Sequence, residues 1–313
     1  MTNFALIGAA GFVAPRHMRA INDVGCRLVA ATDPHVSVGV LDKYSLDTKF
    51  FPEIEGFNRY LEELQRGPQE DRVDWVSVCS PNYLHFAHIY MALQSGANVL
   101  CEKPLVVDPR DLDILQILEQ RYGRRVFTVL QLRLQPNLLK LKEELDKHPE
   151  KSDHEVLLTY VTARGPWYDA TWKGREEHSG GVGVNIGIHL LDVLLWLFGD
   201  VVSYEVHLRN PKQVGGVLQL QRARVRWFLS TEQSDLPFVI EPGVKFSHRE
   251  IVVDGESVEF SGGFIDAHTS VYKETLAGRG MSIAHARPAA ELADSLRTSP
   301  IVTGEPSHPL IQR

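Results

Sequence analysis

The residues best suited to chemistry in this chain are a glutamate, a lysine and a proline in succession, Glu102, Lys103 and Pro104. They come at the end of an apolar segment, residues 99–102, that is typical of a buried strand. A lysine placed there can act as a general base if its environment suits proton transfer near working pH. The alternative is a salt bridge at a strand exit, closed by a rigid turn.

A second polar pair, Asn185 and His189, lies four residues apart at the predicted start of an apolar helix. One helical turn would place both side chains on the same face. The positive end of the helix disfavours an imidazolium, so His189 would stay neutral and able to accept a proton. The alternative is a buried histidine that bonds a backbone carbonyl.

The segments before Glu102 predict a β-α-β unit. Residues 75–79 form an apolar, β-branched run of the kind found in strands buried on both faces. Ser80, Pro81 and Asn82 end that strand, and a helical pattern follows as far as Gly96. Parallel strands end at one edge of a sheet, so residues 80–82 should lie beside residues 102–104, at the edge where open α/β sheets bind ligands.

A glycine turn near the N-terminus predicts dinucleotide binding. The strand at residues 4–7 runs into Gly8, Gly11 and Ala14, and a helix follows at 16–23. Glycines let a pyrophosphate approach the backbone at a helix start, although this turn has one residue more than the usual pattern. Asp33 ends the next strand at about the separation expected of an acid that binds ribose, which favours NAD over NADP. The alternative is an aspartate that only closes its strand.

Strands and helices alternate through the first 130 or so residues, which predicts an α/β fold with a doubly wound parallel sheet. From residue 134 the pattern changes to α+β, with a largely antiparallel sheet. We therefore expect two domains, residues 1–133 and 134–313, with the C-terminal helix able to pack back on the first.

Composition excludes several classes of function. The chain has 313 residues and a net charge of −7, which makes nucleic acid or an anionic membrane a poor partner. We expect no signal peptide, and the longest apolar helix, residues 190–198, is too short to cross a bilayer. The three cysteines lie in or beside core strands, which predicts reduced thiols in a cytoplasmic protein. No metal site is expected, since His85 and His88 lack a convincing third ligand.

The loop at residues 164–173 interleaves Trp167, Tyr168 and Trp172 with Arg164 and Lys173. Aromatic rings beside cations suit a substrate that carries a flat base, phosphates or a carboxylate. An aromatic loop packed on the sheet is equally compatible. Arg222, Arg224 and Arg226 alternate along one strand face, where a wetted surface or a subunit contact is favoured over a phosphate site.

Taken together, these motifs resemble the glucose–fructose oxidoreductase/inositol dehydrogenase family, over essentially the whole chain. The resemblance rests on the Gly8 turn, Asp33, residues 80–82 with His85, residues 102–104, and the glycine run that ends in His189. It implies an N-terminal Rossmann domain that binds NAD, a C-terminal open-sheet domain for substrate binding and oligomerisation, and a homotetramer built through those sheets.

Within that family, residues 8–17, 165–174 and 185–192 resemble enzymes that oxidise C3 of UDP-N-acetyl-2-amino-2-deoxy-D-glucuronate, for diacetamido-uronic acids of bacterial surface polysaccharide. A dehydrogenase of another sugar or cyclitol, and a non-catalytic NAD or sugar-nucleotide sensor, are the alternatives. Whether NADH is released or reoxidised in place by a 2-oxo acid such as 2-oxoglutarate stays open.

The resemblance also implies site residues. Lys103 is the expected base, with His189 bonded to the same hydroxyl, or the reverse. Asn185 stands where many members have an aspartate, so His189 lacks a carboxylate neighbour. The expected cofactor-binding residues are Gly8, Ala10, Gly11, Phe12, Val13, Asp33, Ser80, Pro81, Asn82, His85, Glu102, Lys103 and Gln131. The expected substrate-binding residues are Lys103, Arg164, Tyr168, Trp172, Lys173, Asn185 and His189.

Overall fold

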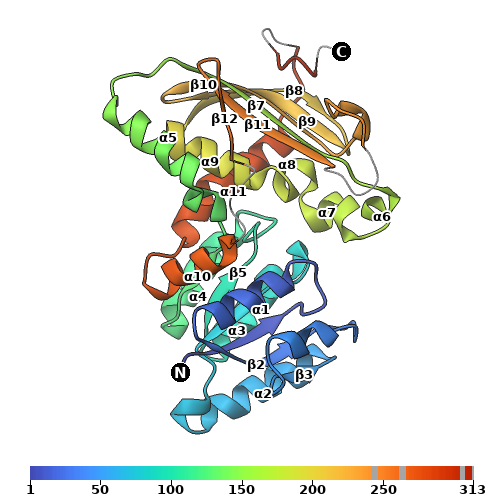
Figure 1. Ribbon diagram of the computed structural model, residues 1–313, viewed down its shortest axis with the longest axis vertical. Coiled ribbons are helices and arrows are strands. Elements are labelled where there is room, and N and C mark those ends of the chain that lie inside the picture. Colours follow the sequence, from blue (N-terminus) through green and yellow to red (C-terminus); the bar gives the residue numbers. More distant parts are fainter. Residues whose placement is uncertain (241–245, 261–265, 304–306, 312–313) are drawn as a thin grey trace. The chain divides into compact units, whose positions relative to one another are not determined.

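The computed structural model describes residues 1–240, 246–260, 266–303 and 307–311. The chain divides into two compact units, each with a six-stranded sheet (Figure 1). The first unit combines Met1–Gln131 with Asp266–Arg287, and the second combines Leu132–Ile265 with Pro288–Arg313.

The sheet of the first unit is parallel throughout, in the order β3-β2-β1-β4-β5-β6. This is the strand order of the doubly wound dinucleotide-binding fold, and the order reverses between β1 and β4. Every residue of β1 is buried, as expected of a strand covered on both faces. The strands are β1 Asn3–Ile7, β2 Arg27–Thr32, β3 Lys49–Phe51, β4 Trp75–Val78, β5 Asn98–Cys101 and β6 Val126–Thr128. The main helices are α1 Ala14–Asp23, α2 Ile54–Arg66, α3 His85–Gln94 and α4 Asp111–Tyr122.

A late segment of the chain completes this first unit. Helix α10, Ala267–Leu276, packs against α1, where Thr269 Oγ1 donates to Asp23 Oδ2 at 2.9 Å. The Arg19 guanidinium pairs with the Asp266 carboxylate at 3.0 Å beside that contact. Residues 266–287 therefore belong with the first unit, although they follow most of the second in sequence.

The sheet of the second unit is mixed, in the order β12-β11-β7-β10-β9-β8. Among the described strands of this second sheet, only β7 and β10 pair in parallel, so the expected α+β unit with a largely antiparallel sheet is confirmed. The strands are β7 His154–Thr162, β8 Val201–Arg209, β9 Gln213–Leu220, β10 Ala223–Ser230, β11 Ser247–Val253 and β12 Glu256–Val258. The longer helices are α5 Pro136–Lys147, α9 Ile188–Phe198 and α11 Ile283–Thr298, of which α11 belongs to this unit from Pro288 onward.

The core of this unit lies on one face of its sheet. Leu191, Leu194 and Phe198 of α9 pack there with Trp227 of β10 and Ile251 of β11. Because α9 is buried on most of its surface, its apolar sequence belongs to a core helix. No single helix in the described part of the chain is long and apolar enough to span a membrane. The segments Glu176–Asn185 and Ile188–Phe198 reach the length and hydropathy of a membrane span only when they are combined, and they are bent relative to each other.

One expectation about this region is wrong. Asn185 and His189 do not share one helical turn, because α8, Gly181–Asn185, ends before α9 begins. The helical segments on the two sides of the break differ in direction by 42°. Gly187 lies in the break, where a Cβ would meet Gly183 O and Leu229 Cδ1, each at 2.5 Å. The close approach of α8 and β10 to this position therefore favours a glycine.

Candidate active site

The Gly8 turn lies where β1 and β4 end side by side. Gly8 has φ +90°, and a Cβ there would lie 2.7 Å from the carbonyl carbon of Cys79 and 2.8 Å from Ser80 N. A Cβ on Gly11 would come 3.1 Å from Gly8 O. Only a turn without side chains fits this close backbone approach, which is the local structure that a pyrophosphate site needs.

Asp33 is fixed beside this turn. It is buried at the end of β2, where Oδ2 accepts the Ala10 N–H at 2.9 Å and Oδ1 accepts the His35 N–H at 2.8 Å. A carboxylate oxygen has two lone pairs, so each oxygen keeps capacity for one more donor, such as a ribose hydroxyl. The aspartate thus orders the glycine turn as well as offering the expected ribose contact.

Glu102 lies at the centre of a buried hydrogen-bond network, immediately after β5. His17 Nε2 and His268 Nε2 lie 3.0 Å and 2.9 Å from Glu102 Oε1. The other oxygen, Oε2, accepts the N–H of Lys103 at 3.2 Å. Burial alone would raise the pKa of Glu102, but the hydrogen bonds from His17 and His268 outweigh it and hold that pKa well below its usual range. The carboxylate is therefore a buried anion.

The protons of this network can be assigned by elimination. An ionised carboxylate only accepts, so both histidine Nε2 atoms must carry hydrogen. Burial lowers the pKa of His17, which is thus neutral with a lone pair on Nδ1. Tyr272 lies 2.8 Å from that atom and must donate to it. Ser77 Oγ, 2.6 Å from the tyrosine oxygen, then donates to Tyr272. Every donor on the path from Ser77 points toward Glu102.

His17, Glu102 and His268 also place one ligand atom each within 4.8 Å of one another, as a metal site would. Their contacts of 2.9–3.0 Å are hydrogen-bond lengths. Ligand atoms around zinc, at about 2.1 Å from the ion, would lie roughly 3.4 Å apart. The two Nε2 hydrogens that the carboxylate requires would also occupy the centre of the cluster, so we assign no metal here.

His85 connects the two strand ends on the other side of Lys103. Its Nδ1 lies 2.7 Å from Pro104 O, and its Nε2 lies 2.9 Å from Ser80 O. Both partners are carbonyl oxygens, so only an imidazolium could donate to both. Burial, the largest influence, lowers the pKa of His85, and therefore one contact lacks its proton at neutral pH. The peptide between Lys103 and Pro104 is cis.

The second unit brings together part of the predicted substrate set. Asn185 Nδ2 donates to the hydroxyl of Tyr168 at 2.6 Å. The guanidinium carbon of Arg164 lies 5.8 Å from the centre of the Tyr168 ring. Lys173 Nζ is 3.9 Å from the centre of the Trp172 ring. Cations therefore lie on aromatic rings here, as the sequence pattern suggests.

Two other polar candidates belong to the second unit. His189 is half-buried in the first turn of α9. Arg222 donates to Leu145 O at 2.7 Å and His148 O at 2.8 Å. Arg222 therefore binds carbonyls at the end of α5. Its guanidinium does not join Arg224 and Arg226 in a common phosphate site.

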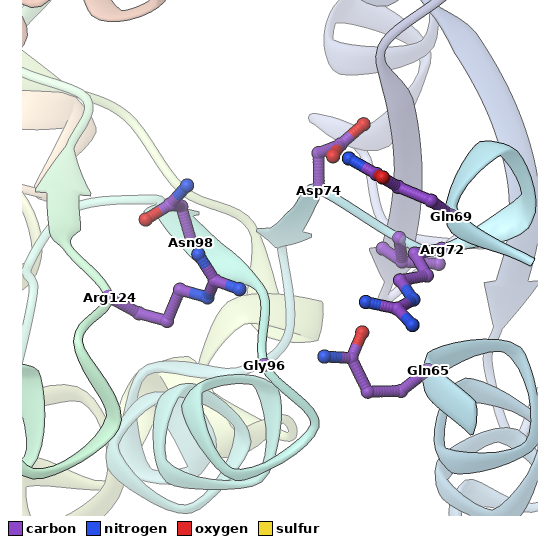
Figure 2. Close-up of a pocket in the computed structure, with 8 residues that line it drawn as sticks. Gln65, Gln69, Arg72, Asp74, Gly96, Asn98 and Arg124 are labelled. Atoms are coloured by element: carbon purple, nitrogen blue, oxygen red, sulfur yellow. The ribbon is translucent and has the colours of Figure 1, made fainter. Parts of the chain in front are cut away.

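Figure 2 shows a polar cavity of about 220 Å³ at the opposite edge of the parallel sheet. It lies by the amino-terminal ends of β4 and β5, whereas Gly8, Ser80 and Glu102 follow carboxyl-terminal ends. We therefore separate it from the candidate active site. Its lining residues are Gln65, Gln69, Arg72, Val73, Asp74, Gly96, Asn98 and Arg124.

Sequence reasoning missed His17, Ser77, His268 and Tyr272. They join Glu102 through contacts that span up to 255 sequence positions, as between His17 and Tyr272. The one local signal was a histidine, His17, on the inner face of α1. Its position does not reveal which residues it contacts.

Comparisons with known proteins agree with this geometry. Residues 2–130 match the GFO_IDH_MocA model, described as an oxidoreductase family with an NAD-binding Rossmann fold. Residues 154–221 match the C-terminal alpha/beta domain of the same family. The WlbA (WbpB) dehydrogenase from Thermus thermophilus, solved with NAD and UDP-GlcNAcA, is 50% identical with a TM-score of 0.93, over 99% of both chains. The same protein has been solved with NAD and alpha-ketoglutarate.

Curated relatives are more distant. The D-glucoside 3-dehydrogenase of Escherichia coli (strain K12) is 26% identical over 45% of this chain and 40% of its own length. An inositol 2-dehydrogenase/D-chiro-inositol 3-dehydrogenase of Halalkalibacterium halodurans is 27% identical over 69% of this chain and 63% of its own length. The matched region thus spans less than two thirds of either relative.

Proposed function

Because this chain belongs to the GFO_IDH_MocA family of oxidoreductases, we propose that it oxidises the C3 hydroxyl of UDP-N-acetyl-2-amino-2-deoxy-D-glucuronate with NAD as acceptor. The observation that carries the substrate is the 50% identity, over 99% of both chains, with a dehydrogenase solved with NAD and UDP-GlcNAcA. A 3-keto sugar nucleotide is the product, in the synthesis of diacetamido-uronic acids for bacterial surface polysaccharide.

In this proposal, the residues of the first unit bind and orient the NAD cofactor. The Gly8 turn and the start of α1 would hold the pyrophosphate, and Asp33 the adenosine ribose. The close packing of the glycine turn supports this assignment, since a Cβ on Gly8 would collide with the backbone of Cys79 and Ser80 and one on Gly11 would crowd Gly8 O. Bound NAD⁺ supplies the hydride acceptor, C4 of the nicotinamide.

Lys103 is the proposed base that takes the O3 proton as C3 loses hydride. It follows the carboxyl end of β5, and its backbone is fixed on both sides by Glu102 and His85. A fixed base is worth most when its atom is already within reach of the proton. His189, half-buried in the first turn of α9, is the other candidate.

Arg164, Tyr168, Trp172, Lys173 and Asn185 are proposed substrate contacts. The pairing of Tyr168 with Asn185, and the cations on aromatic rings, supply donors for a diphosphate or a carboxylate and flat surfaces for a base. A neutral cyclitol would have no use for that charge.

Three further points belong to this proposal. 2-Oxoglutarate is a candidate oxidant that regenerates NAD in place, because the Thermus thermophilus relative was solved with it. The assembly is a homotetramer. The protein works in the cytoplasm, which suits three cysteines without disulfides.

The test is a comparison of kcat/KM for three substrates: UDP-GlcNAcA, UDP-GlcNAc, which lacks the carboxylate, and myo-inositol. We expect NADH formation with the first and a loss of at least about 100-fold with the second, because the half-buried cations Arg164 and Lys173 would lose their charged partner. Preference for myo-inositol would establish a cyclitol dehydrogenase. No turnover of any of the three, with NAD bound, would favour a sensor.

A further inference from the structure

We propose that His268 and His17 are positioning residues for Lys103, which they hold through the Glu102 carboxylate. The inference rests on the proposed function for its kinetic consequence, but the geometry belongs entirely to the first unit. Helix α10 thus carries a group on which the catalytic lysine depends, although it comes 166 positions after Glu102 in sequence.

The argument begins with the two oxygens of Glu102. Oε1 receives both imidazole N–H groups, at 3.0 Å from His17 and 2.9 Å from His268. Oε2 is then left to accept the Lys103 N–H at 3.2 Å. The glutamate side chain therefore folds back onto the backbone of the next residue, and the two histidines keep it there. Without them, a buried carboxylate would have to turn toward other donors or water.

The second step is what this does to Lys103. Its N–H is held by Glu102, and the carbonyl of the following residue, Pro104, is held by His85 in the tautomer that carries its proton on Nδ1. The backbone on both sides of Lys103 is thereby fixed, and so is the direction in which its side chain leaves. Groups that orient a reacting residue through hydrogen bonds typically change activity about 10- to 100-fold when removed.

The third step is electrostatic. Glu102 is a buried anion next to the lysine, and the N–H dipoles of two histidines stabilise its charge and offset part of its field. The titratable groups that face Glu102 from the surrounding elements are His17, Cys79, His85, Cys101, Lys103, His268 and Tyr272. Removal of a donor leaves more negative charge near the lysine, which then holds its proton to higher pH.

The experiment compares substitutions at His268 with one at its neighbour. His268→Gln keeps an amide N–H near the position of Nε2, whereas His268→Asn is too short to reach Glu102 and His268→Leu has no donor. Thr269→Val is the matched control, because it also removes a hydrogen bond between α10 and α1, at 2.9 Å, but leaves Glu102 untouched.

We expect kcat with UDP-GlcNAcA to fall about 10- to 100-fold in His268→Asn and His268→Leu, with little change in NAD affinity. The acid limb of the kcat profile should move to higher pH. His268→Gln should restore most of kcat, and Thr269→Val should keep it. If His268→Leu fails to fold, the Gln and Asn pair decides. The proposal would be overturned if His268→Asn had the same kcat as Thr269→Val and if the acid limb of its kcat profile stayed at the wild-type pH.

A second readout needs no substrate. Lysines are reductively methylated with ¹³C-formaldehyde, and the Lys103 methyl signal, assigned by its loss in Lys103→Arg, is titrated by NMR. We expect its midpoint to rise by about one pH unit in His268→Asn and to stay put in Thr269→Val. An unmoved midpoint in His268→Asn would overturn the proposal. If the wild type forms no NADH from UDP-GlcNAcA, the proposed function fails and this titration still decides the positioning role.

Discussion

Replacement of Gly8 by alanine should destabilise the cofactor edge of the first unit by about 3 kcal/mol. The residue has φ +90°, a region that costs an L side chain about 1–2 kcal/mol. Its Cβ would lie 2.7 Å from the Cys79 carbonyl carbon, well inside the roughly 3.5–4.0 Å of ordinary carbon contact. Forcing two buried backbone segments apart costs about 1–3 kcal/mol more. Alanine also restricts the unfolded chain more than glycine does, which offsets about 0.4–1 kcal/mol of this loss.

The matched control is Gly25→Ala. Gly25 also has a positive φ, +71°, but a Cβ there meets nothing within 4 Å. Only the backbone term applies, so the net loss should be about 1 kcal/mol. The difference between the two variants, about 2 kcal/mol, isolates the clash between the ends of β1 and β4.

Urea unfolding, followed by hydrogen–deuterium exchange of the β1 and β4 peptides, measures both losses. Calorimetric titration with NAD provides the functional readout, and only Gly8→Ala should weaken binding, by at least about tenfold. Equal destabilisation of the two variants, together with unchanged NAD affinity in Gly8→Ala, would refute the close approach that this reasoning assigns to Gly8.

Three further predictions concern single side chains. Asp33→Ser should narrow the preference for NAD over NADP, because the carboxylate that repels a 2′-phosphate is gone; an unchanged ratio of kcat/KM for the two cofactors would remove Asp33 from the ribose site. Lys103→Ala should bind NAD normally and lose about 10²–10⁴-fold in kcat, as measured by steady-state NADH formation; near-normal turnover would remove Lys103 from proton transfer. Burial lowers the pKa of His88 to about 4, below the value of about 6.5 in an unfolded chain, so the unfolded form takes up the proton first. Stability should be full above pH 6.5 and fall by up to about 3 kcal/mol toward pH 4, and His88→Asn should flatten this fall in urea unfolding; parallel curves for the two proteins would show that His88 is not the group.

The sheet and its cofactor edge could be predicted because their signals are local. Apolar β-branched runs, a glycine turn and the step from Cys101 to Lys103 each occupy a few neighbouring residues, and a doubly wound parallel sheet follows from the alternation of strand and helix. The comparisons with known proteins confirm the NAD-binding fold and the family that these signals predicted. The cofactor-binding and substrate-binding residues stay predictions.

What escaped prediction depends on distant or tertiary contacts. Nothing near residue 268 indicates that its imidazole meets Glu102, because hydrogen bonds between remote segments leave no periodic signal. The break between α8 and α9 was missed for a different reason. The apolar pattern continues through it, and the tight packing of Gly187 against Gly183 O and Leu229 of β10 is a tertiary contact that the local pattern does not encode.

The most direct test of the central claim follows a single hydrogen. UDP-GlcNAcA carrying deuterium at C3 is incubated with the protein and NAD⁺, and the nicotinamide product is examined by mass spectrometry and NMR. The account predicts deuterium at C4 of NADH and a 3-keto sugar nucleotide, in equal amounts. Unlabelled NADH, or deuterium released to water with no change in the cofactor, would contradict it.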